Sequence, residues 1–246
     1  EELIVVGQAG VLTPLLKDKG LLDQEFLHIH DAPQVIEMNE KPTDTLRRKR
    51  DSSMLKGIEL VKEGRAQAIL SSGNTGSLMA GGTVRLRPLE GIERPALATV
   101  MPGTRRNAKW CLIDAGANPD SKPKHLVHNA ILGSQYMRGA HNVTRPKVGL
   151  LSIGTEAHKG VPRIRETNKL LEEIGDLIDY HGLVEGFQIY DDVVDVVVCD
   201  GFVGNILLKG SESLFHAFQG ILKEELGSST LRKTGALLAK GAFHGM

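Results

Sequence analysis

The chain has 246 residues, 41% of them hydrophobic, and its 30 Lys and Arg balance its 30 Asp and Glu. This length supports a sizeable core, in one large domain or two small ones. The zero formal charge and the 4% aromatic content argue against a nucleic-acid-binding protein, which usually shows a basic excess and stacking side chains. An integral membrane protein is not expected either, because no run of about 18 apolar residues appears.

Short apolar runs predict the strands. In chain order they are Leu3–Gly7, Phe26–His30, Gln67–Leu70, Ala96–Met101, Trp110–Asp114, Lys147–Gly154 and Asp192–Asp200. The last two are nearly continuous Val, Leu and Ile, which is typical of strands covered on both faces.

Helical spacing of apolar residues lies between these strands. It runs from Met54 to Val61, from Thr167 to Ile174, and from about Val203 to Leu226. Repeated strand–loop–helix units indicate an α/β fold with a mostly parallel sheet and flanking helices. No linker is evident, so we expect a single α/β catalytic domain with a cleft over residues 1–246.

Four loops rich in Gly, Ser, Thr and Asn each follow an expected strand and precede an expected helix. They are Ser71–Ser77, Asp114–Asp120, Ser152–Gly160 and Cys199–Asn205. Ligands of open α/β sheets bind beyond the carboxyl ends of the strands, where helix N-termini offer N–H groups to an anion. We therefore expect the four loops to line one cleft for an anion, with phosphate as the leading candidate. For any one loop taken alone, a turn or helix cap is the favoured explanation, and none has P-loop or G-x-G-x-x-G spacing.

Charged residues in these loops are candidates for chemistry: Asp114, Glu156, Lys159 and Asp200. His158 is expected at the surface. Asp191, Asp192 and Asp195 have the composition of a metal site, but a solvated loop is the favoured interpretation. The basic run Arg47, Arg48, Lys49 and Arg50 is either a solvated helix face or a dock for an acidic partner.

The two cysteines, Cys111 and Cys199, lie in apolar runs without a partner at metal-ligand spacing. We expect reduced core thiols of a cytoplasmic protein. A catalytic thiol is the alternative.

Five segments, in order, together resemble the bacterial phosphate acyltransferase family of phospholipid synthesis. They are LRRKRDSSM, SSGNTGSLMAGG, DAGANPD, IGTEAHKG and DGFVGNILLK, and the match spans roughly Asn39 to Lys209. The resemblance implies a fold similar to isopropylmalate dehydrogenase and phosphotransacetylase, used as a homodimer. It also implies that this chain lacks the family's N-terminal strand and its C-terminal part.

The activity that the resemblance implies is transfer of a fatty acyl group from acyl carrier protein to inorganic phosphate, giving acyl phosphate. The product would pass to a membrane glycerol-3-phosphate acyltransferase. Neither a metal nor an organic cofactor is demanded. Three alternatives stay open: a phosphotransacetylase-like enzyme that uses short acyl-CoA, a metal- and NAD-dependent dehydrogenase, and a non-catalytic phosphate-binding protein.

Phosphate would itself be the nucleophile, which fits the absence of a Ser-His-Asp signature. Lys159 is expected to neutralise phosphate or the developing charge, and Asp200 to accept the phosphate proton or orient Lys159. The N–H groups of Gly73–Gly76 and Gly201–Gly204 are expected to bind phosphate or the oxyanion. The full set of expected binding residues is Ser72, Gly73, Asn74, Thr75, Gly76, Asp114, Asn118, Thr155, Glu156, Gly201, Gly204 and Asn205. The basic run 47–50 would dock the acidic carrier.

The C-terminal segment Ser229–Met246 mixes cations with apolar residues, which is typical of an interfacial helix. The cations are Arg232, Lys233 and Lys240, and the apolar residues are Leu231, Leu237, Leu238 and Phe243. We expect a projecting helix with a possible peripheral membrane contact. A helix packed on the core or on a dimer mate is the alternative.

Overall fold

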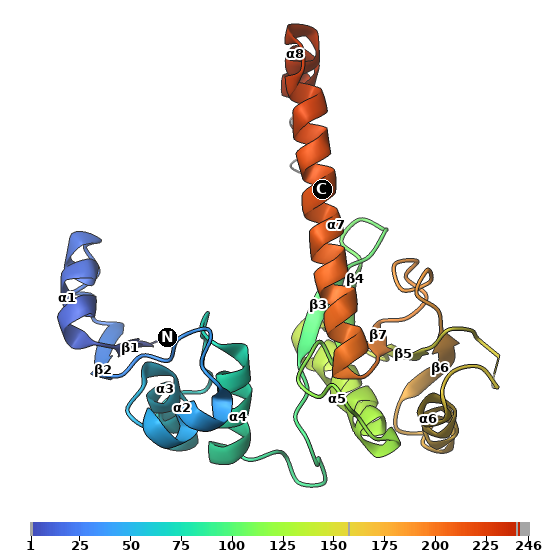
Figure 1. Ribbon diagram of the computed structural model, residues 1–246, viewed down its shortest axis with the longest axis horizontal. Helices are drawn as coiled ribbons and strands as arrows, with labels where there is room; N and C mark the ends of the chain where they lie inside the picture. The colour runs from blue at the N-terminus through green and yellow to red at the C-terminus, as the bar shows by residue number, and fades with distance from the viewer. Residues whose placement is uncertain (1, 157, 240, 242–246) are drawn as a thin grey trace. The chain divides into compact units, whose positions relative to one another are not determined.

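The computed structural model describes residues 2–156, 158–239 and 241. The chain divides into two compact units, Glu1–Pro95 and Ala96–Met246, which are coloured blue to green and green to red in Figure 1. Each has its own sheet and core, and each is described by itself. The single domain expected over residues 1–246 therefore stays a prediction.

The first unit opens with a two-stranded parallel sheet. Strands β1 (Leu3–Gly7) and β2 (Leu27–Asp31) pair in register from Leu3 with Leu27 to Gly7 with Asp31. Helix α1 (Ala9–Asp18) connects them, as a parallel pair requires a crossover. Both expected strands are confirmed.

Three helices complete the first unit: α2 (Pro42–Arg48), α3 (Ser53–Lys62) and α4 (Thr75–Arg85). The helix expected from Met54 to Val61 is confirmed as α3, and its apolar face forms the centre of this core. A Cβ on Gly81 of α4 would lie 2.7 Å from Ile58 Cδ1 of α3. The glycine thus allows the two helices to pack closely.

The strand expected at Gln67–Leu70 is wrong. In the described part of the chain this segment pairs with no strand. Ile69 packs against the α3 core instead, next to Gly57, while Leu70 is fully exposed. The apolar run therefore reflects one anchoring side chain rather than a buried strand, and the loop Ser71–Ser77 does not follow a strand.

The second unit contains a five-stranded sheet in the order β3-β4-β7-β5-β6. These strands are β3 (Ala98–Pro102), β4 (Lys109–Ile113), β7 (Val196–Val198), β5 (Lys147–Leu151) and β6 (Asp179–Val184). Only β3 is antiparallel to its neighbour. The mostly parallel sheet is confirmed, and β6 is a strand that the apolar pattern did not predict.

Helices cover both faces of this sheet. Cys111 and Ile113 of β4 point to the core beneath α5 (Pro123–His141) and α6 (Pro162–Glu173). Trp110 and Leu112 alternate with them and pack on the opposite face, where Leu207 and Leu208 of α7 lie. Because successive side chains face opposite sides and both sides are covered by helices, the central strands are almost continuously apolar.

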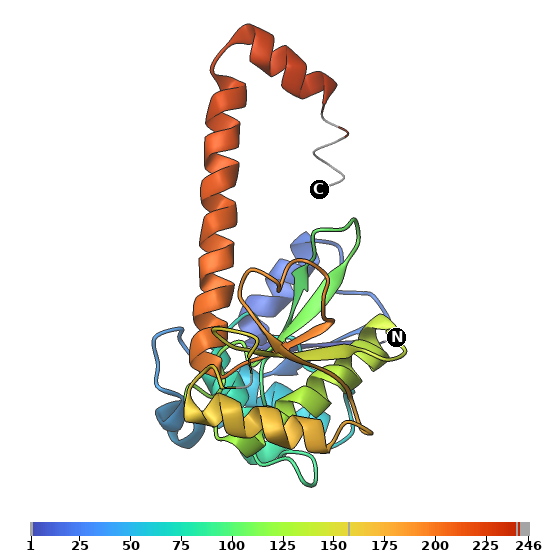
Figure 2. The ribbon, with the colours of Figure 1, turned by 90° about the vertical axis from the view of Figure 1, so that its right-hand side faces the viewer.

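Helix α7 (Gly201–Gly227) starts at the sheet and runs far beyond it within the second unit, as Figures 1 and 2 show. Helix α8 (Thr230–Leu238) follows. The helix expected from Val203 to Leu226 is confirmed. Of the C-terminal segment, Lys240 and Phe243 lie outside the described residues. Among the described helices, none has the length and apolar character needed to cross a membrane.

Candidate functional site

Three of the four expected loops leave the same edge of the second unit's sheet. Strands β4, β7 and β5 are parallel neighbours, so the loops that begin at Asp114, Cys199 and Ser152 share their carboxyl ends. After β4 the chain enters α5 on one face, and after β7 it enters α7 on the other. Such a change of face between neighbouring strands is where α/β sheets bind ligands. The loop Ser71–Ser77 belongs to the first unit, and its place in a common cleft stays a prediction.

Asp114 organises the loop after β4. Its carboxyl group is buried and accepts hydrogen bonds of 2.8–3.1 Å from backbone N–H groups and the Asn118 side chain. The backbone donors are those of Leu97, Gly116, Ala117 and Asn118. Both carboxylate oxygens are therefore engaged, and Asp114 holds the loop rather than offering an oxygen to substrate.

Two glycines let the start of α7 pack against this loop. The Gly201 N–H donates to the Asn118 carbonyl at 2.9 Å, and a Cβ on Gly201 would lie 2.8 Å from the Asn118 nitrogen. A Cβ on Gly204 would overlap the Asp114 carbonyl oxygen. Gly201 and Gly204 are thus required by backbone packing. Asn205 lies beside Gly116 in the same contact.

Asp200 is the N-cap of α7. Its Oδ1 accepts from the N–H groups of Phe202 and Val203, both at 3.0 Å. Its Oδ2 accepts from Arg163 Nη2 at 2.6 Å, and the side chain is only 5% exposed. The N–H of Gly204 bonds to the Asp200 carbonyl. The N–H groups of residues 201–204 are therefore satisfied within the protein, and their expected role in binding an anion stays a prediction.

Lys159 is exposed in the loop after β5 and has no ion-pair partner among the described residues. A Cβ on Gly154 would lie 2.9 Å from both Lys159 Cγ and Glu156 Oε2. The missing side chain at Gly154 thus lets the two charged side chains fold over the loop. Thr155 and His158 are also exposed. Ala157 lies outside the described residues.

Arg163, the second residue of α6, was not among the expected site residues. Its guanidinium joins the Asp200 carboxylate and, at 3.4 Å, Asp120 Oδ1 at the end of the β4 loop. Its position just after the loop Ser152–Gly160 is the feature of the sequence that could have identified it as a site residue. The structure therefore adds one cation to the three-loop edge.

In the first unit, Asn74 has a structural role. Its Oδ1 caps α4 by accepting from the Ser77 N–H at 2.9 Å. Its Nδ2 donates to backbone carbonyls of Glu37, Met38 and Glu40. Gly73 donates its N–H to Ser71 Oγ at 3.2 Å, while Ser72, Thr75 and Gly76 are exposed. Asn74 therefore ties this loop both to the start of α4 and to the segment 37–40.

The basic run divides into two kinds of residue. Lys49 Nζ donates to Glu40 Oε2 at 2.6 Å and to the Val35 carbonyl at 2.5 Å. The hydrogen bond from Lys49 lowers the pKa of Glu40. The three arginines of the run are exposed. Lys49 therefore fixes the local structure, and only the arginines stay available for a partner.

The acidic residues before β7, Asp191, Asp192 and Asp195, are not arranged as a metal site. Asp192 Oδ2 lies 2.8 Å from Arg105 Nε, whose hydrogen bond lowers the pKa of this carboxyl group. Asp195 Oδ2 accepts from the Lys147 N–H at 2.8 Å. In the described ranges, no group of three or more His, Cys, Asp or Glu residues is placed to hold a metal ion.

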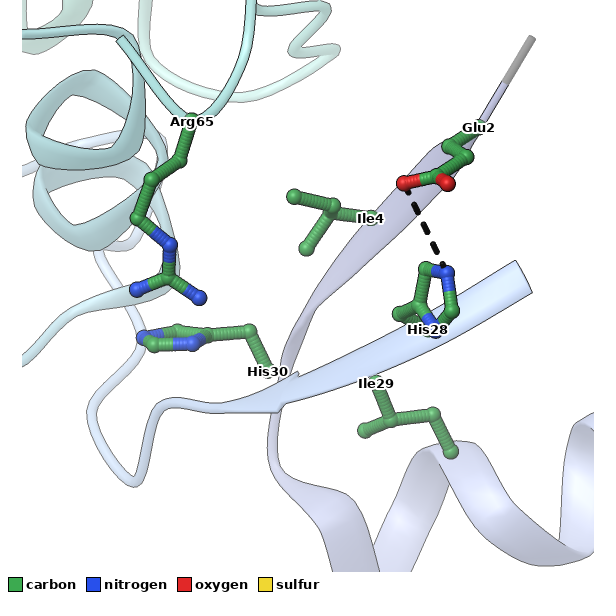
Figure 3. Close-up of a pocket in the computed structure, with 6 residues that line it drawn as sticks. All are labelled: Glu2, Ile4, His28, Ile29, His30 and Arg65. Carbon is green, nitrogen blue, oxygen red and sulfur yellow. Dashed lines mark ion pairs between the residues drawn. The ribbon is translucent and has the colours of Figure 1, made fainter. Parts of the chain in front are cut away.

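A shallow pocket of about 300 Å³ lies on the β1–β2 sheet of the first unit (Figure 3). Its lining residues are Glu2, Ile4, His28, Ile29, His30 and Arg65. Glu2 Oε2 and His28 Nε2 are 3.8 Å apart. None of the expected site residues lines this pocket, so it does not support the sequence-based site.

Both cysteines are buried. Burial raises the pKa of Cys111 to about 12 and raises the pKa of Cys199 further still, with added repulsion from Asp200 and Asp114. We expect iodoacetamide at pH 8 to label neither thiol in the folded protein, because burial shields both from the reagent and disfavours the reactive thiolate. Mass spectrometry should find both labelled after denaturation. Rapid labelling of the folded protein would restore the catalytic-thiol alternative.

Comparison with known proteins identifies relatives along the whole chain. The sequence profile described as "Fatty acid synthesis protein" matches residues 1–246. A phosphate acyltransferase of Myxococcus xanthus is 42% identical over 100% of this chain and 69% of its own length. One from Geobacter sulfurreducens is 47% identical over 87% of this chain and 61% of its own. The chain thus spans about two thirds of these relatives.

Solved structures show the same fold at much lower identity. A phosphotransacetylase from Streptococcus pyogenes superposes with a TM-score of 0.65 at 20% identity, covering 87% of this chain and 74% of its own. The EutD phosphotransacetylase from Staphylococcus aureus has a TM-score of 0.59 at 18% identity, with the same coverage. The expected phosphotransacetylase-like architecture is confirmed.

Proposed function

Because this chain belongs to the fatty acid synthesis protein family, we propose that its protein is a phosphate acyltransferase that makes acyl phosphate from acyl carrier protein thioester and inorganic phosphate. The observation that carries this proposal is the 42–47% identity to phosphate acyltransferases over most of the chain. The sheet edge formed by the loops after β4, β5 and β7 supports this proposal. It brings Lys159 and Arg163 together with polar backbone groups at the carboxyl ends of the strands, where α/β folds bind ligands.

The reaction needs few protein groups. A phosphate oxygen attacks the thioester carbonyl carbon, the carbon–sulfur bond breaks, and the carrier thiolate leaves and takes up the proton that hydrogen phosphate loses. The protein must position a dianion and stabilise the oxyanion that forms on the carbonyl. Lys159 suits both tasks, since its ammonium is exposed and free of an ion pair among the described residues.

We expect Lys159→Ala to lower turnover about 100-fold, the usual scale for the loss of a group that stabilises developing charge. The test is acyl phosphate formation from acyl carrier protein thioester and phosphate by the purified protein. Lys147→Ala is the matched control, because Lys147 is an exposed lysine at the opposite end of β5 and should leave turnover unchanged. A near-normal rate for Lys159→Ala would remove this residue from the mechanism. A wild-type protein that makes only acetyl phosphate from acetyl-CoA would favour the phosphotransacetylase alternative.

The finer assignments are also proposals. We infer that the carrier docks on Arg47, Arg48 and Arg50, whose exposed guanidinium groups attract an acidic surface. We also infer a cytoplasmic homodimer, and exposed apolar side chains along α7 support the dimer. Those side chains are Leu214, Phe215, Phe218 and Ile221.

We propose two alternative partners for helix α8, a membrane surface or a dimer mate. Leu231, Leu237 and Leu238 of α8 are 71–85% exposed in this chain, so they do not pack on the core of their own unit. A peripheral membrane contact would place the product near a membrane glycerol-3-phosphate acyltransferase. A dimer mate would cover the same leucines.

A further inference from the structure

Arg163 connects three elements of the second unit at the carboxyl end of its sheet. It stands at the start of α6, directly after the β5 loop, and its side chain is 29% exposed. Nη2 donates to Asp200 Oδ2 at 2.6 Å, and Nη1 donates to Asp120 Oδ1 at 3.4 Å. The guanidinium thus lies between the loops that follow β4 and β7.

The two carboxylates that bind Arg163 differ in burial and in how firmly they are held. The Asp200 side chain is 5% exposed and is fixed through Oδ1 by two N–H groups of α7. The Asp120 side chain is fully exposed, and its contact is long. An exposed ion pair of this kind contributes about 1 kcal/mol or less. Asp200 is therefore a permanent anchor for the guanidinium, whereas an arriving anion can replace Asp120.

The guanidinium also has donor capacity left over. Nε is buried and has no hydrogen-bond acceptor among the described residues. An arginine presents its N–H groups in a rigid fork that suits phosphate oxygens. The backbone N–H groups of residues 201–204 are already satisfied, which favours a side-chain donor beside the α7 cap.

We propose that Arg163 binds the phosphate substrate and that Asp200 acts as the positioning residue that holds its guanidinium, an inference that rests on the proposed function. Phosphate replaces Asp120 on Nη1 and attacks the thioester from there, while Lys159 meets the remaining charge. Arg163 stays protonated throughout. Asp200 takes no proton in this scheme, because both of its oxygens already accept hydrogen bonds in the protein. This replaces the role of proton acceptor that the sequence suggested for it.

The test measures acyl phosphate formation by the purified protein at varied phosphate concentrations. Arg163→Gln should raise the KM for phosphate at least about 10-fold, as expected for the loss of a charged hydrogen bond, and leave the KM for the acyl carrier thioester within about twofold. Arg163→Lys should recover part of the loss. Arg145→Gln is the matched control, because Arg145 is an exposed arginine just before the amino end of β5.

A second measurement does not depend on turnover. Inorganic phosphate should raise the Tm of the wild type and of Arg145→Gln, and this rise should vanish in Arg163→Gln. An unchanged phosphate KM and an unchanged rise in Tm would overturn the assignment, as would a loss of kcat alone. If the wild type forms no acyl phosphate, the proposed function fails, and the Tm series still decides whether Arg163 binds phosphate.

Discussion

Gly204→Ala should lower the free energy of unfolding by about 3 kcal/mol or more, measured by urea denaturation. The new Cβ would overlap the Asp114 carbonyl oxygen and lie 3.0 Å from Cys199 Sγ. Neither neighbour can yield easily, because one is backbone fixed by the Asp114 turn and the other lies in the core. Overpacking of this kind costs about 1–3 kcal/mol, and more when backbone must move. We also expect acyl phosphate formation to fall sharply, because α7 must shift away from the β4 loop.

Gly210→Ala is the matched control for this substitution. Gly210 lies nearly two turns further along α7 and is exposed, and a Cβ added there would meet no atom within 4 Å. Alanine there should raise stability by about 0.5–1 kcal/mol, since glycine weakens a helix interior. If Gly204→Ala were as stable as Gly210→Ala, the close contact between α7 and the Asp114 loop would be disproved.

The sequence was most informative where local pattern and burial agree. The apolar runs at Leu3–Gly7, Trp110–Asp114 and Lys147–Gly154 form strands because each has neighbours that continue the ladder. The run Gln67–Leu70 has the same composition but anchors a loop through Ile69. Composition does not reveal whether a neighbouring strand is available. The opposite case is β6, which forms a strand although its apolar pattern is weak and its Gly182 has a positive φ.

The sequence predicted the placement of the loops better than the contacts within them. Gly-rich loops after expected strands were predicted to share one sheet edge, and three of the four do. The sequence could not show that the polar groups of Asp114 and Asp200 satisfy the protein's own N–H groups, because hydrogen-bond partners depend on tertiary packing. For the same reason Arg163 was missed, since only the fold brings α6 beside the α7 cap.

Asp114→Asn tests how strongly the loop after β4 depends on one buried carboxylate. Asp114 is fully buried, and its carboxylate oxygens accept from five N–H donors. An amide of the same shape keeps one acceptor oxygen and replaces the other with a donating NH₂ group. In either orientation the NH₂ group faces N–H groups that have lost their acceptor.

We expect Asp114→Asn to cost at least about 3 kcal/mol in the free energy of unfolding, because each buried donor left without an acceptor costs about 1–3 kcal/mol. Hydrogen exchange should accelerate at the amides of Gly116, Ala117 and Asn118, which now bond to this carboxylate. Asp120→Asn makes the same chemical change in the same loop on a fully exposed side chain, so its stability should change by less than about 0.5 kcal/mol. Equal stability of the two variants would mean that the loop does not depend on the Asp114 carboxylate, and the packing of α7 against it would then have to be explained by the glycines alone.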